Sequence, residues 1–131
     1  MAGKSDYLEN KFLDHVLRNT AYTQPATVYV GLYLDGFPPT DAGGGTEVSG
    51  NAYARKAVAF GAAAGGVASN TGVITFDTPT PSGWGTVSHI GIFDAASAGN
   101  LLYWAPLSVS RLVSAGEPPF FAIGAITVSE D

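Results

Sequence analysis

The chain has 131 residues, enough for one domain with a single hydrophobic core. Hydrophobic residues make up 46% of it and charged residues only 13%, a balance typical of a folded protein rather than a disordered one. The formal net charge of −5 disfavours a protein that grips nucleic-acid phosphates, and the absence of cysteine excludes disulfide bonds and thiolate metal sites.

The sequence predicts neither a membrane-spanning helix nor an N-terminal signal peptide. No apolar segment approaches the roughly 20 residues that a transmembrane helix needs. The first residues are polar and charged where a signal peptide would be apolar. We therefore expect a soluble protein that is made in a cytoplasm and stays there or is assembled from there.

The only predicted helix covers about residues 6–18. Asp6 and Glu9 have the spacing of a capping pair at its start. Apolar residues recur at helical spacing along it: Leu8, Phe12, Leu13, Val16 and Leu17. This stripe either plugs one end of a sheet core, the commoner use of such a stripe, or docks on a neighbouring subunit or host surface.

Residues 27–34 predict a strong strand with two different faces. One face is aliphatic and holds Val28, Val30, Leu32 and Leu34. The other holds Tyr29 and Tyr33, so we expect it to be half-buried, under a loop or against a partner. Residues 35–50 then lack any periodicity and contain three consecutive glycines, which predicts either a contact arm or a loose surface loop.

The clearest strand–turn–strand pattern spans residues 84–104. Strict alternation would place Thr86, Ser88, Ile90 and Ile92 on one side of the first strand and Val87, His89, Gly91 and Phe93 on the other. Residues 94–100 are small and polar, as in a hairpin loop. Residues 101–104 are apolar on both faces, which predicts a position inside a packed sheet.

Shorter patterns complete the predicted fold. Further strands are expected at residues 55–60, 73–76, 107–113 and 120–128, separated by turn-rich segments. Many short strands behind one helix predict a mainly β, single-domain β-sandwich or jelly-roll-like fold over residues 1–131.

The chain offers little chemistry. His15 and His89 are isolated, and a lone histidine is most often packed and hydrogen-bonded. Ser88, His89 and Asp94 could form a nucleophilic triad, but alternation points Ser88 and His89 to opposite faces, and no G-x-S-x-G turn is present. We therefore expect no catalytic residue.

The glycine-rich loop offers no convincing ligand site either. Asp35, Asp41 and Glu47 flank it and could bind Ca²⁺, but the spacing of an EF-hand is missing. The glycines at 43–45 lack the Lys-Ser/Thr of a phosphate-binding loop. The sequence predicts no enzyme, no cofactor and no metal.

Four stretches carry a resemblance to a known family: SDYLENKFLDHVLRNTAY, PATVYVGLYLD, DAGGGTEVSGNAYARKAVAF and WGTVSHIGIFDAASAGNLLYW. Together they resemble a family of small structural proteins of tailed bacteriophages. Its members are described as tail-fibre proteins, and some similar small β-domains are capsid decoration or cement subunits. The resemblance implies a virion protein and brings no catalytic residues.

Physical reasoning then favours one place in the particle. A fibre needs a coiled coil, a repeat or a β-helix, and none is visible. We therefore expect a capsid decoration or cement protein that bridges capsomers. The alternative is a short tail-fibre, tail-tip or baseplate component that binds host glycans.

The expected partners are the major capsid protein or neighbouring virion subunits, not nucleic acid or membrane. A symmetric homo-oligomer, a dimer or trimer, is expected in a virion assembled in the host cytoplasm. The candidate contact residues are Leu8, Phe12, Tyr29, Tyr33, Phe37, Tyr53 and Trp84.

A second class of function is a carbohydrate-binding module. Such sites use exposed aromatic side chains, and the candidates are Tyr53, Trp84, Tyr103 and Trp104. The competing interpretation is that both tryptophans are partly buried core residues, which is the commoner use of so large an apolar side chain.

Overall fold

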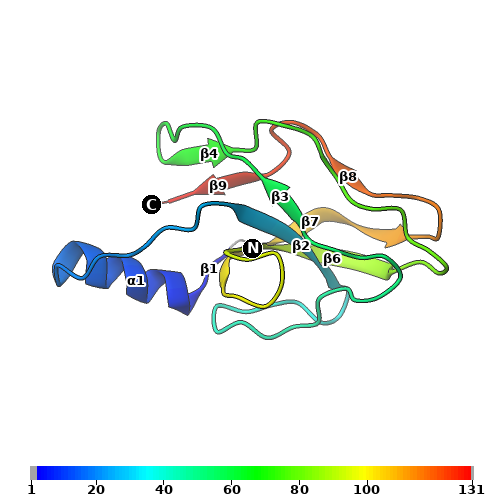
Figure 1. Cartoon of the computed structure of the whole chain (residues 1–131), viewed down its shortest axis with the longest axis horizontal. Helices are drawn as coiled ribbons and strands as arrows, with labels where there is room; N and C mark the ends of the chain where they lie inside the picture. The colour runs from blue at the N-terminus through cyan, green and yellow to red at the C-terminus, as the bar shows by residue number, and fades with distance from the viewer. Residues whose placement is uncertain (1–2, 131) are drawn as a thin grey trace.

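A five-stranded antiparallel sheet organises the fold in the computed structural model, which describes residues 3–130 (Figure 1). The strands lie in the order β1-β7-β6-β2-β3. Their bounds are Gly3–Lys4 for β1, Leu101–Val113 for β7, Gly85–Phe93 for β6, Val28–Leu34 for β2 and Lys56–Val58 for β3. The long β6–β7 hairpin and β2 form its centre, as the pattern of residues 84–104 predicted.

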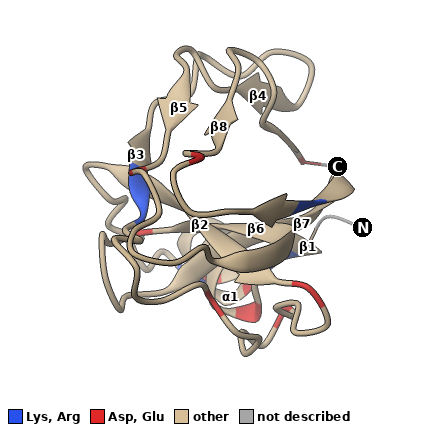
Figure 2. Ribbon diagram, turned by 90° about the vertical axis from the view of Figure 1, so that its right-hand side faces the viewer, with Lys and Arg blue, Asp and Glu red and all other residues tan. Residues whose placement is uncertain are grey.

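Two short strand pairs cover one face of this sheet, and the helix lies at the other (Figure 2). The pairs are β4 (Val67–Ser69) with β9 (Thr127–Ser129), and β5 (Ile74–Thr75) with β8 (Phe120–Phe121). The predicted class is confirmed: a mainly β fold consistent with a β-sandwich, with one N-terminal helix. Within residues 3–130, no helix is long and apolar enough to cross a membrane.

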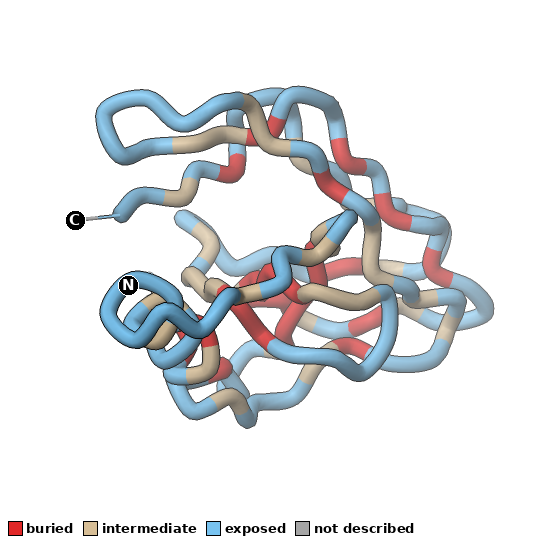
Figure 3. Tube along the Cα trace, turned by 60° about the vertical axis from the view of Figure 1, so that its left-hand side comes forward, coloured by how far each residue is buried: buried red, intermediate tan, exposed pale blue. Residues whose placement is uncertain are grey.

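The main core draws its buried residues from both layers (Figure 3). Val30 and Leu32 of β2 contribute its most deeply buried aliphatic side chains, and Phe76 and Trp84 its largest buried aromatic ones. A smaller cluster of Tyr33, Phe93 and Leu101 lies apart from it. The central strands are therefore buried on both faces, which explains their nearly continuous apolar sequence.

Helix α1 spans Asp6–Leu17, but its cap is Ser5 rather than the predicted Asp6. The Ser5 hydroxyl accepts a hydrogen bond from the backbone N–H of Leu8 at 3.2 Å and donates one to the carbonyl of Leu101. Ser5 therefore both starts the helix and ties it to β7. The sequence placed the cap one residue late because Asp6 and Glu9 imitate the same spacing.

The predicted alternation of β6 is wrong at its centre. A register shift between Val87 and His89 puts Val87 in the same core cluster as Ile90 and Ile92. A β-bulge of this kind inserts a residue into one strand of a pair and resets which face each side chain occupies.

Near the C-terminal end of the chain, the structure differs from two of the predicted strands. Residues 107–113 do not form a separate strand but continue β7, with Pro106 inside it next to the register shift. Residues 120–128 do not form one long strand, because a turn at Ala122–Ala125 divides them into β8 and β9. Gly124 has φ 75° in this turn, and no extended strand accommodates that angle.

The glycine-rich loop follows a path that neither prediction described. It returns along β2 and forms two backbone hydrogen bonds with it. The N–H of Leu34 donates to the carbonyl of Thr46 at 2.9 Å, and the N–H of Val48 donates to the carbonyl of Leu32 at 2.9 Å. Val48 is buried in the main core. The second half of the loop therefore extends the edge of the sheet beyond β3 instead of projecting as an arm.

Candidate functional surfaces

The polar cluster around Arg55 joins the loop between β2 and β3 to the loop between β6 and β7. Arg55 places one nitrogen 2.8 Å from each carboxylate oxygen of Glu47 and donates further hydrogen bonds to the carbonyls of Ala95 and Ala98, at 2.9 and 2.8 Å. Its guanidinium also lies 3.5 Å from the centre of the Phe93 ring. Because the Arg55 side chain is only 8% exposed, this cluster holds the β6–β7 loop against the glycine-rich loop.

The pKa values of Arg55, Tyr53 and the neighbouring Tyr33 are all raised above their usual values. Burial would lower the pKa of Arg55, but its hydrogen bond to Glu47 and the charge of Glu47 outweigh that effect and raise it. Burial and the hydrogen bond to Glu47 raise the pKa of Tyr53 well above its usual range. Burial raises the pKa of Tyr33 to about 12. The cluster therefore has the character of a structural clamp.

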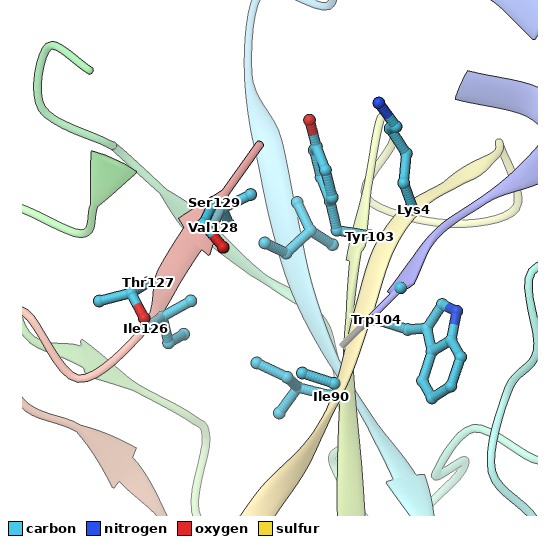
Figure 4. A pocket seen from close by; sticks show the side chains of 11 residues that line it. Lys4, Ile90, Tyr103, Trp104, Ile126, Thr127, Val128 and Ser129 are labelled. Atoms are coloured by element: carbon cyan, nitrogen blue, oxygen red, sulfur yellow. The ribbon is translucent and has the colours of Figure 1, made fainter. Parts of the chain in front are cut away.

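The second polar cluster lies where the chain ends meet. The Tyr103 hydroxyl donates to Glu130 at 2.6 Å, and the Lys4 ammonium lies 2.7 Å from the other oxygen of the same carboxylate. Burial alone would raise the pKa of Glu130, but these two hydrogen bonds lower it. The cluster borders a small groove of about 210 Å³, in which Tyr103 extends toward Lys4 while the neighbouring Trp104 extends to the other side of the strand (Figure 4).

The predicted histidine and serine meet, but no triad forms. Because of the bulge in β6, Ser88 Oγ lies 2.8 Å from His89 Nδ1, so the expectation that they face apart is wrong. Burial lowers the pKa of His89. Asp94 instead accepts two hydrogen bonds from Asn100, at 2.7 and 2.9 Å, and closes the hairpin loop.

Two of the three candidate carboxylates near the glycine-rich loop have partners within the chain. Asp41 accepts a hydrogen bond from the Trp104 indole at 2.8 Å, and Glu47 belongs to the Arg55 cluster. Among residues 3–130, no three His, Asp or Glu side chains gather closely enough to hold a metal ion together.

The candidate contact residues divide by burial. Leu8, Tyr33 and Trp84 are at most 6% exposed, so they belong to the interior and cannot form a surface contact in this structure. Phe12, Tyr29 and Tyr53 are half-buried, and Phe37 is exposed. Period-two and helical spacing place a residue on a face, but they do not show that Tyr33 is buried in a cluster with Phe93 and Leu101.

The candidate sugar-binding aromatics do not form one platform. Trp84 is buried and donates its indole N–H to the carbonyl of Asn51 at 2.9 Å, as the core interpretation predicted. Tyr53 packs against Trp84 with ring centres 5.3 Å apart. Tyr103 and Trp104 lie on opposite sides of β7.

Two groups of exposed apolar side chains contain none of the predicted contact residues. The outer half of α1 exposes Leu13, Val16 and Leu17, so only Leu8 of the predicted stripe enters the core. The second group surrounds a groove of about 730 Å³ that we call the seam. The seam is lined by Leu107, Val109 and Arg111 of β7 and, across from them, by Phe120, Ile126 and Thr127.

The sequence contained a signal for the seam. Leu107, Val109 and Leu112 place apolar side chains on both faces of a strand that also carries Pro106 and Arg111. Proline and a basic residue are typical of a sheet edge, whereas apolar residues on both faces are typical of a covered strand. Their combination indicates an edge strand whose apolar side chains are covered by another surface.

The comparisons with known proteins identify a family. Residues 3–129 match the model of the family described as podophage GP4 fiber I protein gp80. The comparison with curated proteins found no match.

Proposed function

The chain belongs to the podophage GP4 fiber I protein gp80 family, and from this membership we propose that it is a structural, non-enzymatic component of a phage tail fibre. A phage virion structural protein is what the resemblance implied. The family description favours the fibre alternative over the head-decoration role that physical reasoning preferred, and it does not support the latter.

The chemistry of the surface supports an architectural role. The Glu47–Arg55 and Lys4–Glu130 clusters are closed by ion pairs within the chain, and Asp94 is saturated by Asn100. Among residues 3–130, two groups of exposed apolar side chains stand out: the outer half of α1 and the seam. Contiguous exposed apolar patches on a soluble domain mark contacts with other subunits.

The observation that carries this proposal is the family match over residues 3–129. The described residues contain neither a coiled coil nor a long β-helix, so they supply a compact part of the fibre. Its partners are neighbouring fibre subunits, including further copies of itself.

The test is to locate the protein in the particle. A small tag fused at residue 131 and labelled with gold-conjugated antibody is expected to mark the tail in electron micrographs of infectious particles. Label on the head, at the positions of capsid proteins, would overturn the fibre role and restore the decoration role.

A further inference from the structure

The two layers of the sandwich are joined on one side and open on the other. Beyond Tyr103 and Trp104, which pair with β1, the outer edge of β7 has no partner strand within residues 3–130. β9 pairs only with β4 in the same part of the chain. The layers connect near β3 and part on the side of β7 (Figure 2). The seam therefore lies between the free edge of β7 and the other layer, represented by β8 and the start of β9.

The seam exposes side chains that belong in a core. Val109 is 77% exposed and Phe120 is 64% exposed, while Leu32, Val87 and Ile126 beneath them are almost fully buried. The lining of the groove is more apolar than polar, so water in contact with it gives up part of its hydrogen bonding. Covering it with apolar surface is favourable.

The charges at the seam indicate which surface covers it. Arg111 is the only ionisable residue among those of the described chain that line the seam. Glu117 lies two residues before the lining residue Pro119, on the turn that joins β7 to β8. Among the described residues, neither Arg111 nor Glu117 takes part in an ion pair. One copy of this chain therefore offers the cation and the anion that a second copy needs.

The overall charge is consistent with this occupant. A chain with net charge −5 repels its own copies, so they meet most readily through a face that carries little charge. No Asp or Glu is among the described residues that line the seam. Pro106 removes one backbone N–H from the free edge of β7, which favours side-chain contact over a full strand ladder.

We propose that the seam is the interface between copies of this chain, which form a closed homo-oligomer with Arg111 of one copy against Glu117 of the next. The inference deepens the proposed function, since it names the surface by which fibre subunits associate. Closed symmetry is the usual outcome for soluble homo-oligomers.

The test compares aspartate variants at exposed apolar positions. Light scattering after size-exclusion chromatography is expected to show an oligomer for the wild-type chain and a monomer for Val109→Asp and Phe120→Asp. Val73→Asp is the matched control, because Val73 is 58% exposed and does not line the seam. Leu17→Asp controls for the helix stripe. Both controls are expected to stay oligomeric.

An exchange of charges tests the same interface without placing a new charge at an apolar position. Arg111→Glu and Glu117→Arg are each expected to weaken association at least tenfold, and the double variant is expected to restore it. Circular dichroism checks that each variant keeps the wild-type fold. A monomeric wild-type chain, an oligomer insensitive to Val109→Asp, or one lost in Leu17→Asp alone would overturn the proposal.

Different experimental results would refute the self-association and the fibre role. If Val109→Asp prevents incorporation into particles although the wild-type chain is monomeric, another virion protein covers the seam. The self-association is then refuted, while the fibre role stands. Label on the head with an intact oligomer refutes the fibre role alone.

Discussion

At the scale of single residues, Arg55 is the side chain whose loss we expect to cost most among the charged ones. Arg55→Met removes the guanidinium that lies over the Phe93 ring, and it leaves Glu47 without its cation and two loop carbonyls without their donor. Removing one partner of a largely buried ion pair costs roughly 3 kcal/mol. Urea unfolding should show a decrease of that size in the free energy of unfolding.

Arg18→Met is the matched control for this prediction. Arg18 pairs with Asp14 at 3.3 Å on the surface of α1, and its side chain is 72% exposed. Such a pair contributes at most about 0.5 kcal/mol, so this variant should unfold almost as the wild-type chain does. Equal effects of the two substitutions would show that Arg55 does not act as a clamp.

The sequence could predict the surface pair but not the clamp. Asp14 and Arg18 are four residues apart on a helix, a separation that fixes their contact. Arg55 reaches Glu47, Ala95 and Ala98, which lie 8, 40 and 43 residues away along the chain. No local pattern encodes such contacts, because the path of the glycine-rich loop brings them about.

At the scale of elements, α1 is expected to be stabilised by its first turn alone. Leu8 is 3% exposed, so Leu8→Ala should lower the free energy of unfolding by about 2–4 kcal/mol. Leu17 is 73% exposed, and Leu17→Ala should change it by less than about 0.5 kcal/mol. Thermal unfolding of both variants measures the difference. Similar losses would mean that the outer half of α1 is covered.

The turn between β8 and β9 gives a second prediction at this scale. Gly124→Ala should lower the free energy of unfolding by about 1–2 kcal/mol, because φ is 75° and a side chain disfavours that angle. Gly72→Ala is the matched control, since an added methyl group also meets open space there, without a positive φ. Urea unfolding should show the control unchanged or slightly stabilised.

The elements that the sequence predicted well are those set by local pattern. The helix, β2 and the β6–β7 hairpin have long periodic segments, and all were predicted. The division of residues 120–128 was missed because it depends on Asn70, whose side chain bonds the carbonyl of Ala122 at 3.0 Å and the N–H of Ile126 at 2.9 Å. A buried amide more than 50 residues away thus holds a turn within an apolar run.

At the scale of the whole molecule, the open side of the sandwich explains why burial within one chain is incomplete. The main core reaches the floor of the seam, so the hydrophobic layer continues to the surface there. A cover over the seam would complete it. Stability of the isolated chain should therefore depend on protein concentration if copies provide that cover.

The whole molecule should also lose stability in alkali. Burial raises the pKa of Tyr33 from 10.0 to about 12 and raises those of Tyr53 and Tyr103 as well. In the unfolded chain these hydroxyls lose their protons near pH 10, so above that pH the unfolded state binds fewer protons than the folded one. The free energy of unfolding is therefore expected to be unaffected by these groups below about pH 9 and to fall from about pH 10 toward 12.

Tyr33→Phe isolates one contribution to this loss. No hydrogen bond of the Tyr33 hydroxyl is found among residues 3–130, so the substitution removes a titrating group while the ring can still stack on Phe93. Urea unfolding at a series of pH values should show a shallower alkaline decrease for the variant than for the wild-type chain. Because only a proton retained by the folded state produces that slope, parallel decreases would mean that Tyr33 titrates alike in both states.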